Sequence, residues 1–141
     1  MASYSLEKTI STDISKVLPL AHTVSRRVYR LTHSDELAFK IKLAIEEALT
    51  NAMRHGNKLD RNLKVHVKIA ADAKKITIDI RDQGSGFDHR GVPDPTTPQR
   101  AGHPSGRGVY LMRKIMDSVR YFDKGRRVVL VKALDKHAKK N

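Results

Sequence analysis

Three polar side chains of the segment "IEEALTNAMRHG", residues 45–56, are spaced so that they share one face of a helix. Glu47, Asn51 and His55 lie four residues apart, and residues at this spacing are neighbours on a helical surface. The opposite stripe of the same segment is apolar. The polar face must therefore look either at water or at a polar cavity.

Two glycine-containing motifs, and the long loop over 83–105 between them, decide between these options. "DQGSG", residues 82–86, follows an apolar strand pattern, and "GRG", residues 106–108, precedes a helical pattern. A carboxylate such as Asp82 at a strand end can accept a hydrogen bond from an exocyclic amine, which adenine has and guanine lacks at that position. Glycines at a helix start let backbone N–H groups approach phosphate, and the helix dipole favours the anion.

Together these features predict an adenine nucleotide held between a helix face and a lid. The site is not a P-loop, because the sequence contains no G-x-x-x-x-G-K-[ST]. The loop over 83–105 is rich in Gly, Pro, Thr and Asp, and structureless loops of this length are usually lids or binding loops.

Apolar periodicity predicts the elements that must position these groups. Ser34 is expected to cap the second helix, and Gly56 to end it in a left-handed conformation. Pro19 must sit near the first turn of the first helix, where its missing N–H is harmless. In chain order, the pattern predicts a strand over 4–11, a helix over 14–31, a helix over 35–56, strands over 63–70 and 75–80 forming an antiparallel hairpin, a helix over 108–119 and a strand over 126–134.

The charge of the chain is strongly and unevenly basic. The formal net charge is +13, and the sequence from Gly106 onward carries eleven Lys/Arg against three Asp/Glu. Such a field attracts polyanions, which include nucleic acids, acidic proteins and nucleotides. Aromatic residues are few and no zinc-finger, RNA-recognition or helix-turn-helix signature is present, so direct nucleic-acid binding is not expected. Linear loss of log affinity with log salt concentration would be its signature.

Composition and length favour one domain in a reducing compartment. The 141 residues contain no cysteine and no apolar stretch near the ~20 residues of a membrane span. The first residues have no cationic start followed by an apolar block, so no membrane association and a cytoplasmic location are expected. We expect a single domain over 1–134, followed by a disordered basic tail over 135–141. The histidines are scattered, which argues against a metal cluster.

The chain resembles a known family, the GHKL or Bergerat-fold ATPases, in three motifs. "EEALTNAMRHG" looks like the N box of that family, "DQGSGF" like the G1 box and "SGRGVYLM" like the G2 box, and the resemblance covers residues 34–134. The phrase "IKLAIEEALTNAMRHG" is most similar to anti-sigma-factor serine/threonine kinases of partner-switching systems. The resemblance implies an α+β fold, a two-layer α/β sandwich whose mixed, mostly antiparallel sheet is covered on one face by about three helices.

The resemblance also implies roles for particular residues and two cofactors, ATP and Mg²⁺. Asn51 would hold Mg²⁺ through its side-chain oxygen, and Glu47 would be the general base that accepts the proton of the attacking hydroxyl. The other ATP-binding positions would be Asp82, Gly84 and Gly86 around the adenine, and Gly106, Arg107 and Gly108 around the phosphates. Relatives commonly have a threonine after the glycine that precedes the last strand, whereas Arg126 and Arg127 stand here. The lid arginine of relatives would be matched by Arg100 or Arg107.

The function implied is that of an ATP-dependent serine/threonine kinase that binds a sigma factor. Its phosphoryl acceptor would be a STAS-domain anti-anti-sigma protein, and relatives form homodimers through the first strand and helix. The alternative is a nucleotide-binding interaction module that captures partners without kinase turnover.

Overall fold

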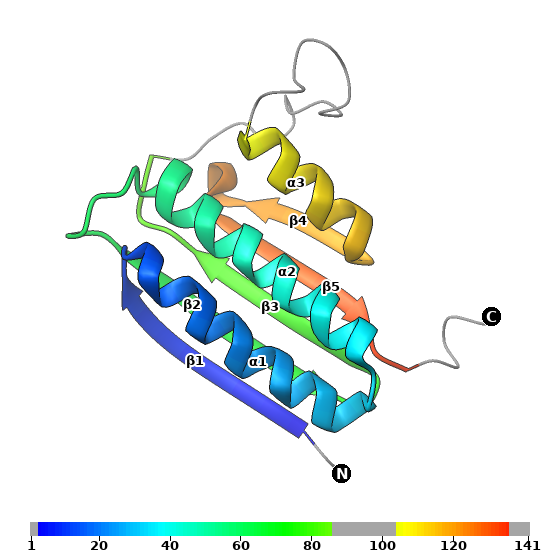
Figure 1. Ribbon diagram of the computed structural model, residues 1–141. Coiled ribbons are helices and arrows are strands. Elements are labelled where there is room, and N and C mark those ends of the chain that lie inside the picture. The colour runs from blue at the N-terminus through cyan, green and yellow to red at the C-terminus, as the bar shows by residue number, and fades with distance from the viewer. Residues whose placement is uncertain (1–2, 86–103, 136–141) are drawn as a thin grey trace.

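The computed structural model describes residues 3–85 and 104–135, with three α-helices on one face of a five-stranded sheet (Figure 1). The strand order is β1-β2-β3-β5-β4, and every neighbouring pair in it is antiparallel. This confirms the predicted two-layer α+β fold with a mostly antiparallel sheet. The elements are β1 (Ser3–Ser11), a 3-10 turn η1 (Ile14–Lys16), α1 (Val17–Thr32), α2 (Asp35–Asn51), a π-helical turn η2 (Ala52–Gly56), β2 (Lys64–Asp72), β3 (Lys75–Arg81), α3 (Pro104–Ile115), β4 (Ser118–Phe122), a 3-10 turn η4 (Asp123–Gly125) and β5 (Arg127–Ala133).

The core lies between the sheet and the helices and follows the predicted alternation. On β3, every second residue is fully buried against the helices, and the register joins Ile78 to Ile69 of β2 and Leu130 of β5. The apolar stripe of α2 packs over this row, with Ile41 and Ile45 at zero exposure. Burying an Ile or Leu side chain contributes roughly 1.5–3 kcal/mol. The central strands and α2 therefore form the fixed frame of the molecule.

The turn between β2 and β3 explains the predicted hairpin. Asp72 Oδ1 accepts hydrogen bonds from the backbone N–H of Lys74 at 2.7 Å and of Lys75 at 3.0 Å. The bonds from Lys75 and Lys74 lower the pKa of the Asp72 carboxyl. A side chain that satisfies two turn N–H groups makes a tight reversal favourable, and the predicted antiparallel hairpin is confirmed.

The first two helices begin as the sequence predicts. Pro19 lies in the first turn of α1, which a 3-10 turn precedes. Ser34 has an extended backbone, and its side chain accepts a hydrogen bond of 3.1 Å from the N–H of Leu37. Asp35 and Glu36 follow in the first turn, where the helix dipole favours acidic side chains.

The prediction of a helix over 108–119 is wrong at both ends. The helix α3 begins at Pro104, a residue suited to a first helical position, and it ends at Ile115. The chain then enters β4, which the sequence pattern did not predict. The helical spacing of Met112 and Met116 continues to Val119, and this spacing conceals the strand.

Contacts with β5 explain why the chain leaves the helix at this point. The N–H of Asp117 donates to the Val131 carbonyl at 3.0 Å, and Asp117 Oδ2 accepts from the N–H of Ala133 at 2.6 Å. The ammonium of Lys132 donates to the Ile115 carbonyl at 2.8 Å, where a positive charge favours the helix C-terminus. These bonds end α3 and begin β4.

Most of the predicted lid, including Arg100, and all but one residue of the predicted tail over 135–141 lie outside the described residues. Within residues 3–85 and 104–135, no helix is both long and apolar enough to cross a membrane.

The cap of α2 can be tested by substitution. Ser34→Ala removes the acceptor for the Leu37 N–H, so we expect the free energy of unfolding to fall by about 1 kcal/mol. Ser34→Asp keeps an acceptor and should retain most of that stability. Urea unfolding of both variants and the wild type measures the difference. Equal stability of the Ala variant and the wild type would show that the cap contributes nothing.

Candidate functional site

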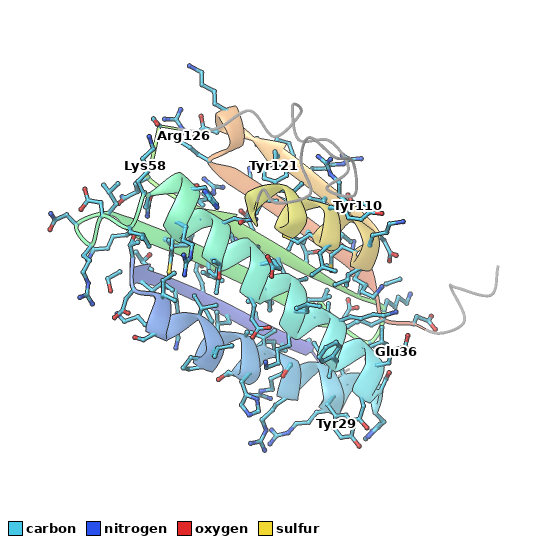
Figure 2. All side chains as sticks on the ribbon, turned by 45° about the horizontal axis from the view of Figure 1, so that its top comes forward. Tyr29, Glu36, Lys58, Tyr110, Tyr121 and Arg126 are labelled. Carbon is cyan, nitrogen blue, oxygen red and sulfur yellow. The ribbon has the colours of Figure 1, made fainter. Side chains whose placement is uncertain are left out.

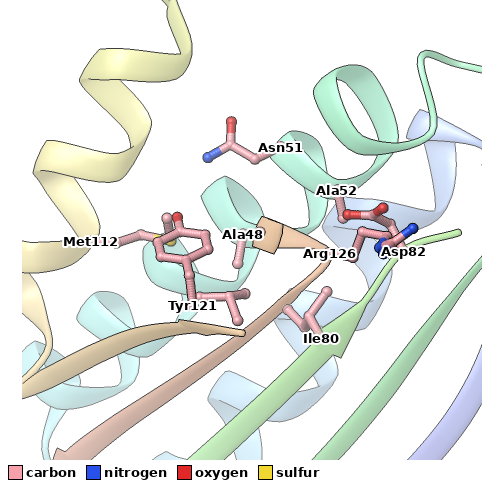
Figure 3. Close-up of a pocket in the computed structure, with 10 residues that line it drawn as sticks. Ala48, Asn51, Ala52, Ile80, Asp82, Met112, Tyr121 and Arg126 are labelled. Atoms are coloured by element: carbon pink, nitrogen blue, oxygen red, sulfur yellow. The ribbon is translucent and has the colours of Figure 1, made fainter. Parts of the chain in front are cut away.

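A pocket opens between α2 and α3 at the end of the sheet where β3 ends and β5 begins (Figure 3). It contains about 270 Å³ of space not filled by atoms, part of it open to solvent. The centre of a water-sized sphere fits in only about 10 Å³ of it, so the enclosed part holds about one water molecule and is far smaller than a nucleotide. Its lining consists of Ala48, Asn51, Ala52, Ile80, Asp82, Met112, Tyr121, Gly125, Arg126 and Val128.

The lining combines apolar walls with a few polar groups. Ile80, Met112 and Val128 are buried and supply apolar surface. Burial raises the pKa of Tyr121 to about 12, so its hydroxyl is neutral at physiological pH. The polar groups of Asn51 and Asp82 stand on different elements and border the same space (Figure 3). Such a lining suits a flat apolar ring with a polar edge.

Asp82 is held by the backbone around it. Its N–H donates to the Arg126 carbonyl at 2.8 Å, which extends the pairing of β3 with β5, and its Oδ1 accepts from the N–H of Gly84 at 2.9 Å. Burial raises the pKa of the Asp82 carboxyl, although the Gly84 N–H and the charge of Arg126 act in the opposite direction. Within the described residues Oδ2 accepts no hydrogen bond, so Asp82 can accept one from a ligand.

Gly56 does not end the helix in a left-handed conformation as predicted. The left-handed residues are Lys58 and Leu59, with φ of 52° and 60°. Gly56 is required for a different reason, because a Cβ there would overlap the Asp82 carboxylate and lie only 2.9 Å from its farther oxygen. A Cβ on Gly84 would overlap the carbonyl group of Gly56. The two glycines allow the end of the π-helical turn to contact the segment after β3.

Asn57 is a positioning residue that the sequence analysis missed. Its side chain is buried, and its Nδ2 donates to Thr12 Oγ1 at 2.8 Å and to the Lys64 carbonyl at 3.0 Å. Its Oδ1 accepts from the N–H of Gln83 at 2.8 Å. This amide thus fixes the residue next to Asp82 against the end of η2. An asparagine after a glycine is typical of many turns, so the sequence carried no specific signal.

The predicted polar face of α2 is only partly shared with the pocket. Asn51 borders the pocket, and its Nδ2 is buried without a hydrogen-bond partner in the part of the chain that the structure describes. Buried polar groups are nearly always paired, so this amide indicates a ligand or water. Glu47 lies one turn earlier, half-buried, and neither Glu47 nor His55 is among the lining residues. Burial, and then the neighbouring charge of Glu46, raises the pKa of the Glu47 carboxyl.

The glycines of the predicted phosphate cradle form the first part of α3 rather than a loop before it. Gly106, Arg107 and Gly108 lie in the helix, which begins at Pro104. The first N–H groups of a helix have no partner within it and attract anions. Figure 1 shows that α3 begins at the end of the molecule where α2 ends. Gly86 lies outside the described residues.

The two arginines that depart from the resemblance have different surroundings. Arg127 pairs with Asp79 through bonds of 2.8 to 3.2 Å and lies over the ring of Phe122. Arg127 does not line the pocket, whereas Arg126 does. Only Arg126 therefore bears directly on a ligand in this space.

Comparison with known proteins finds matches over most of the chain. The family described as histidine kinase-like ATPase domain matches residues 10–132. A serine-protein kinase RsbW from Bacillus licheniformis is 32% identical over 123 residues, which are 81% of this chain and 76% of that relative. The protein of the same name from Bacillus subtilis (strain 168) is 30% identical over 109 residues, 73% of this chain and 66% of the relative. One from Listeria innocua is 28% identical over 113 residues, 75% and 72% of the two chains.

The close approach at Gly56 yields a stability prediction. Gly56→Ala places a Cβ against the Asp82 carboxylate, and we expect it to lower the free energy of unfolding by about 1–3 kcal/mol. An alanine normally stabilises a helical position, so the sign itself tests the contact. In an Asp82→Ala background the same change should cost much less. Urea unfolding of the four proteins measures this coupling, and equal costs in both backgrounds would contradict the contact.

The raised pKa of Asp82 yields a pH prediction. When folding raises the pKa of an acid, the folded state binds the proton more tightly than the unfolded state does. The contribution of that acid to stability is fully present below its unfolded pKa and is lost as the pH rises through its folded pKa. Asp82→Asn keeps the acceptor for Gly84 but cannot ionise. We expect its stability relative to wild type to be more favourable at neutral than at acidic pH, measured by urea unfolding without nucleotide.

Asp72 provides the matched control, because hydrogen bonds lower its pKa. Asp72→Asn should therefore lose stability relative to wild type as the pH rises from acidic to neutral. The same pH trend in both variants would contradict the assignment for Asp82.

Proposed function

This chain belongs to the histidine kinase-like ATPase domain family, and on that premise we propose that it binds ATP with Mg²⁺ and phosphorylates a serine or threonine of a partner protein. The observation that carries the proposal is the pocket in which the Asn51 amide and the Asp82 carboxylate border one apolar space. The kinase activity is suggested by the relatives named serine-protein kinase.

In this proposal the adenine occupies the space between Ile80, Met112 and Val128. Support comes from the chemistry of Asp82, whose Oδ2 has no hydrogen bond within the described chain and can accept one from the N6 amine. A guanine would present a carbonyl oxygen to the same carboxylate, which is repulsive. The ionised form of Asp82 is the better acceptor, because protonation turns one of the two carboxyl oxygens into a donor.

The phosphates extend from this space toward the start of α3. Unpaired N–H groups of the first helical turn attract the anion, and the amide oxygen of Asn51 can hold a hard cation. When bound, Mg²⁺ would neutralise charge on the phosphate oxygens, and it takes only one or two protein ligands beside its waters. The buried atom of Asn51 without a partner in the described chain is Nδ2, a donor, which could bond a phosphate oxygen while Oδ1 faces the cation.

Glu47 accepts the proton of the attacking hydroxyl in this proposal. It lies one turn from Asn51 on α2, and its half-buried position raises its pKa toward the range in which a carboxylate is an effective base. Phosphoryl transfer depends mainly on positioning and charge neutralisation, so one base beside the bound nucleotide is sufficient protein chemistry.

The partners follow from the family resemblance. We propose that the acceptor is a STAS-domain anti-anti-sigma protein, that the chain also binds a sigma factor, and that it acts as a homodimer. A second candidate function is nucleotide-dependent partner capture without phosphoryl transfer. Two observations favour this alternative, because Arg126 borders the pocket and Glu47 does not.

Phosphotransfer tests the two candidates. Purified protein is incubated with labelled ATP, Mg²⁺ and candidate STAS-domain partners, and we expect wild type to label a partner and Glu47→Gln to do so about 10²–10⁴ times more slowly. ATP at a hundredfold its Kd should still stabilise both proteins by about 2.7 kcal/mol. Glu36→Gln is the matched control, since Figure 2 shows Glu36 at the opposite end of the molecule from Arg126, and it pairs with Lys40 at 2.8 Å.

The outcomes separate the proposals. No labelling by wild type with a partner that it captures in the presence of ATP would favour the module without turnover. Absence of any ATP-dependent change in thermal stability would exclude both.

A further inference from the structure

The Arg126 side chain joins two segments at the open side of the pocket. Its Nε donates to the Asp123 carbonyl at 3.2 Å, and one terminal nitrogen donates to Asp123 Oδ1 at 3.1 Å. The other terminal nitrogen reaches the Gly84 carbonyl at 3.4 Å. The guanidinium therefore connects the turn between β4 and β5 with the segment that follows Asp82. Figure 2 shows it at the edge of the molecule beside η4.

The same guanidinium is the positive charge that acts on Asp82. Burial raises the pKa of the Asp82 carboxyl, the Gly84 N–H and Arg126 lower it, and the charge of Asp123 raises it again. The hydroxyl of Tyr121, which borders the pocket, is neutral. Ala52 and Gly56, which approach Asp82 from the helix, have no charged side chain. Arg126 thus offsets part of the cost of an ionised carboxylate in this place.

We propose that Arg126 is a positioning residue for the adenine, which stands beside the Asp82 carboxylate (Figure 3) and closes the outer wall of the pocket with a planar guanidinium. This inference rests on the proposed function, because it requires a nucleotide in the pocket.

Two physical properties of arginine support this role. A guanidinium is planar and can lie against an aromatic ring while its edge donates several hydrogen bonds, whereas a lysine is a point charge without this geometry. The Arg126 guanidinium donates hydrogen bonds to Asp123 and to the Gly84 carbonyl, and these bonds hold its plane at the pocket wall. Lysine at this position would keep the positive charge beside Asp82 but would lose the planar fork of N–H donors of the guanidinium.

The test compares ATP affinity and its pH dependence in four proteins: wild type, Arg126→Gln, Arg126→Lys and Lys124→Gln. Lys124 is exposed in the same turn and does not line the pocket, so its substitution removes an equal charge nearby. Calorimetric titration with ATP and Mg²⁺ is carried out from about pH 8 down to about pH 5, because the pKa of the Asp82 carboxyl is raised above that of an ordinary aspartate. Titration of the phosphates is common to all four proteins and cancels in the ratio of their Kd values.

We expect Arg126→Gln to bind ATP roughly tenfold more weakly than wild type near neutral pH, consistent with loss of a charged hydrogen-bonding group. The ratio should grow as the pH falls, because Asp82 without its counter-charge protonates at higher pH. Arg126→Lys should be several-fold weaker with the pH profile of wild type, and Lys124→Gln should match wild type in both. A structural defect alone would weaken binding equally at every pH.

Three results would overturn the inference. These are an unchanged affinity in Arg126→Gln, a Kd ratio to wild type that is constant with pH, or an equal effect in Lys124→Gln. If the Gln variant does not fold, wild-type affinity in Arg126→Lys would overturn the role of the planar fork. A wild type that binds no ATP at any pH would instead reject the proposed function itself.

Discussion

The close contact between the π-helical turn η2 and the segment after β3 is the constraint on which the site depends. Two backbones meet where neither residue carries a Cβ, at Gly56 and Gly84, and the Asp82 carboxylate lies in the gap. The side chain of Asn57 joins the same two segments by accepting from the Gln83 N–H, and it also donates to Thr12 and to the Lys64 carbonyl. Because of this contact, a carboxylate from the sheet and an amide from α2 border the same pocket.

The cost of this arrangement is an ionised group in a poorly solvated place. The Asp82 and Glu47 carboxyls both have raised pKa values, and burial is the largest cause for each. A protein optimised for stability alone would pair or remove such groups. The chain carries a large excess of positive charge, yet among the groups that perturb Asp82 only Arg126 is cationic. The charge of these carboxylates is therefore only partly compensated by the protein, and a ligand that donates a hydrogen bond to them would stabilise it.

Much of the fold was predictable because its signals are local. The alternation in β2 and β3 and the Ser34 cap depend on neighbouring residues alone, and the structure confirms both. The strand β4 was not predictable, because the spacing of Met112, Met116 and Val119 favours a helix, and only pairing with distant β5 ends it. A glycine motif singled out Asp82, whereas the contact of Gly56 with Asp82 and the bond of Asn57 to Gln83 each join residues 26 apart in sequence.

The π-helical turn also makes this part of the chain sensitive to length as well as to residue type. A π-turn accommodates one more residue than an α-helical turn does. Deleting one residue from η2 would remove the residue that the wider turn accommodates and restore α-helical winding. The bond of 2.8 Å from the Asn57 N–H to the Ala52 carbonyl, which spans five residues, would then be lost. Homologues of this chain should therefore vary in composition between α2 and β2 more freely than they gain or lose single positions within η2.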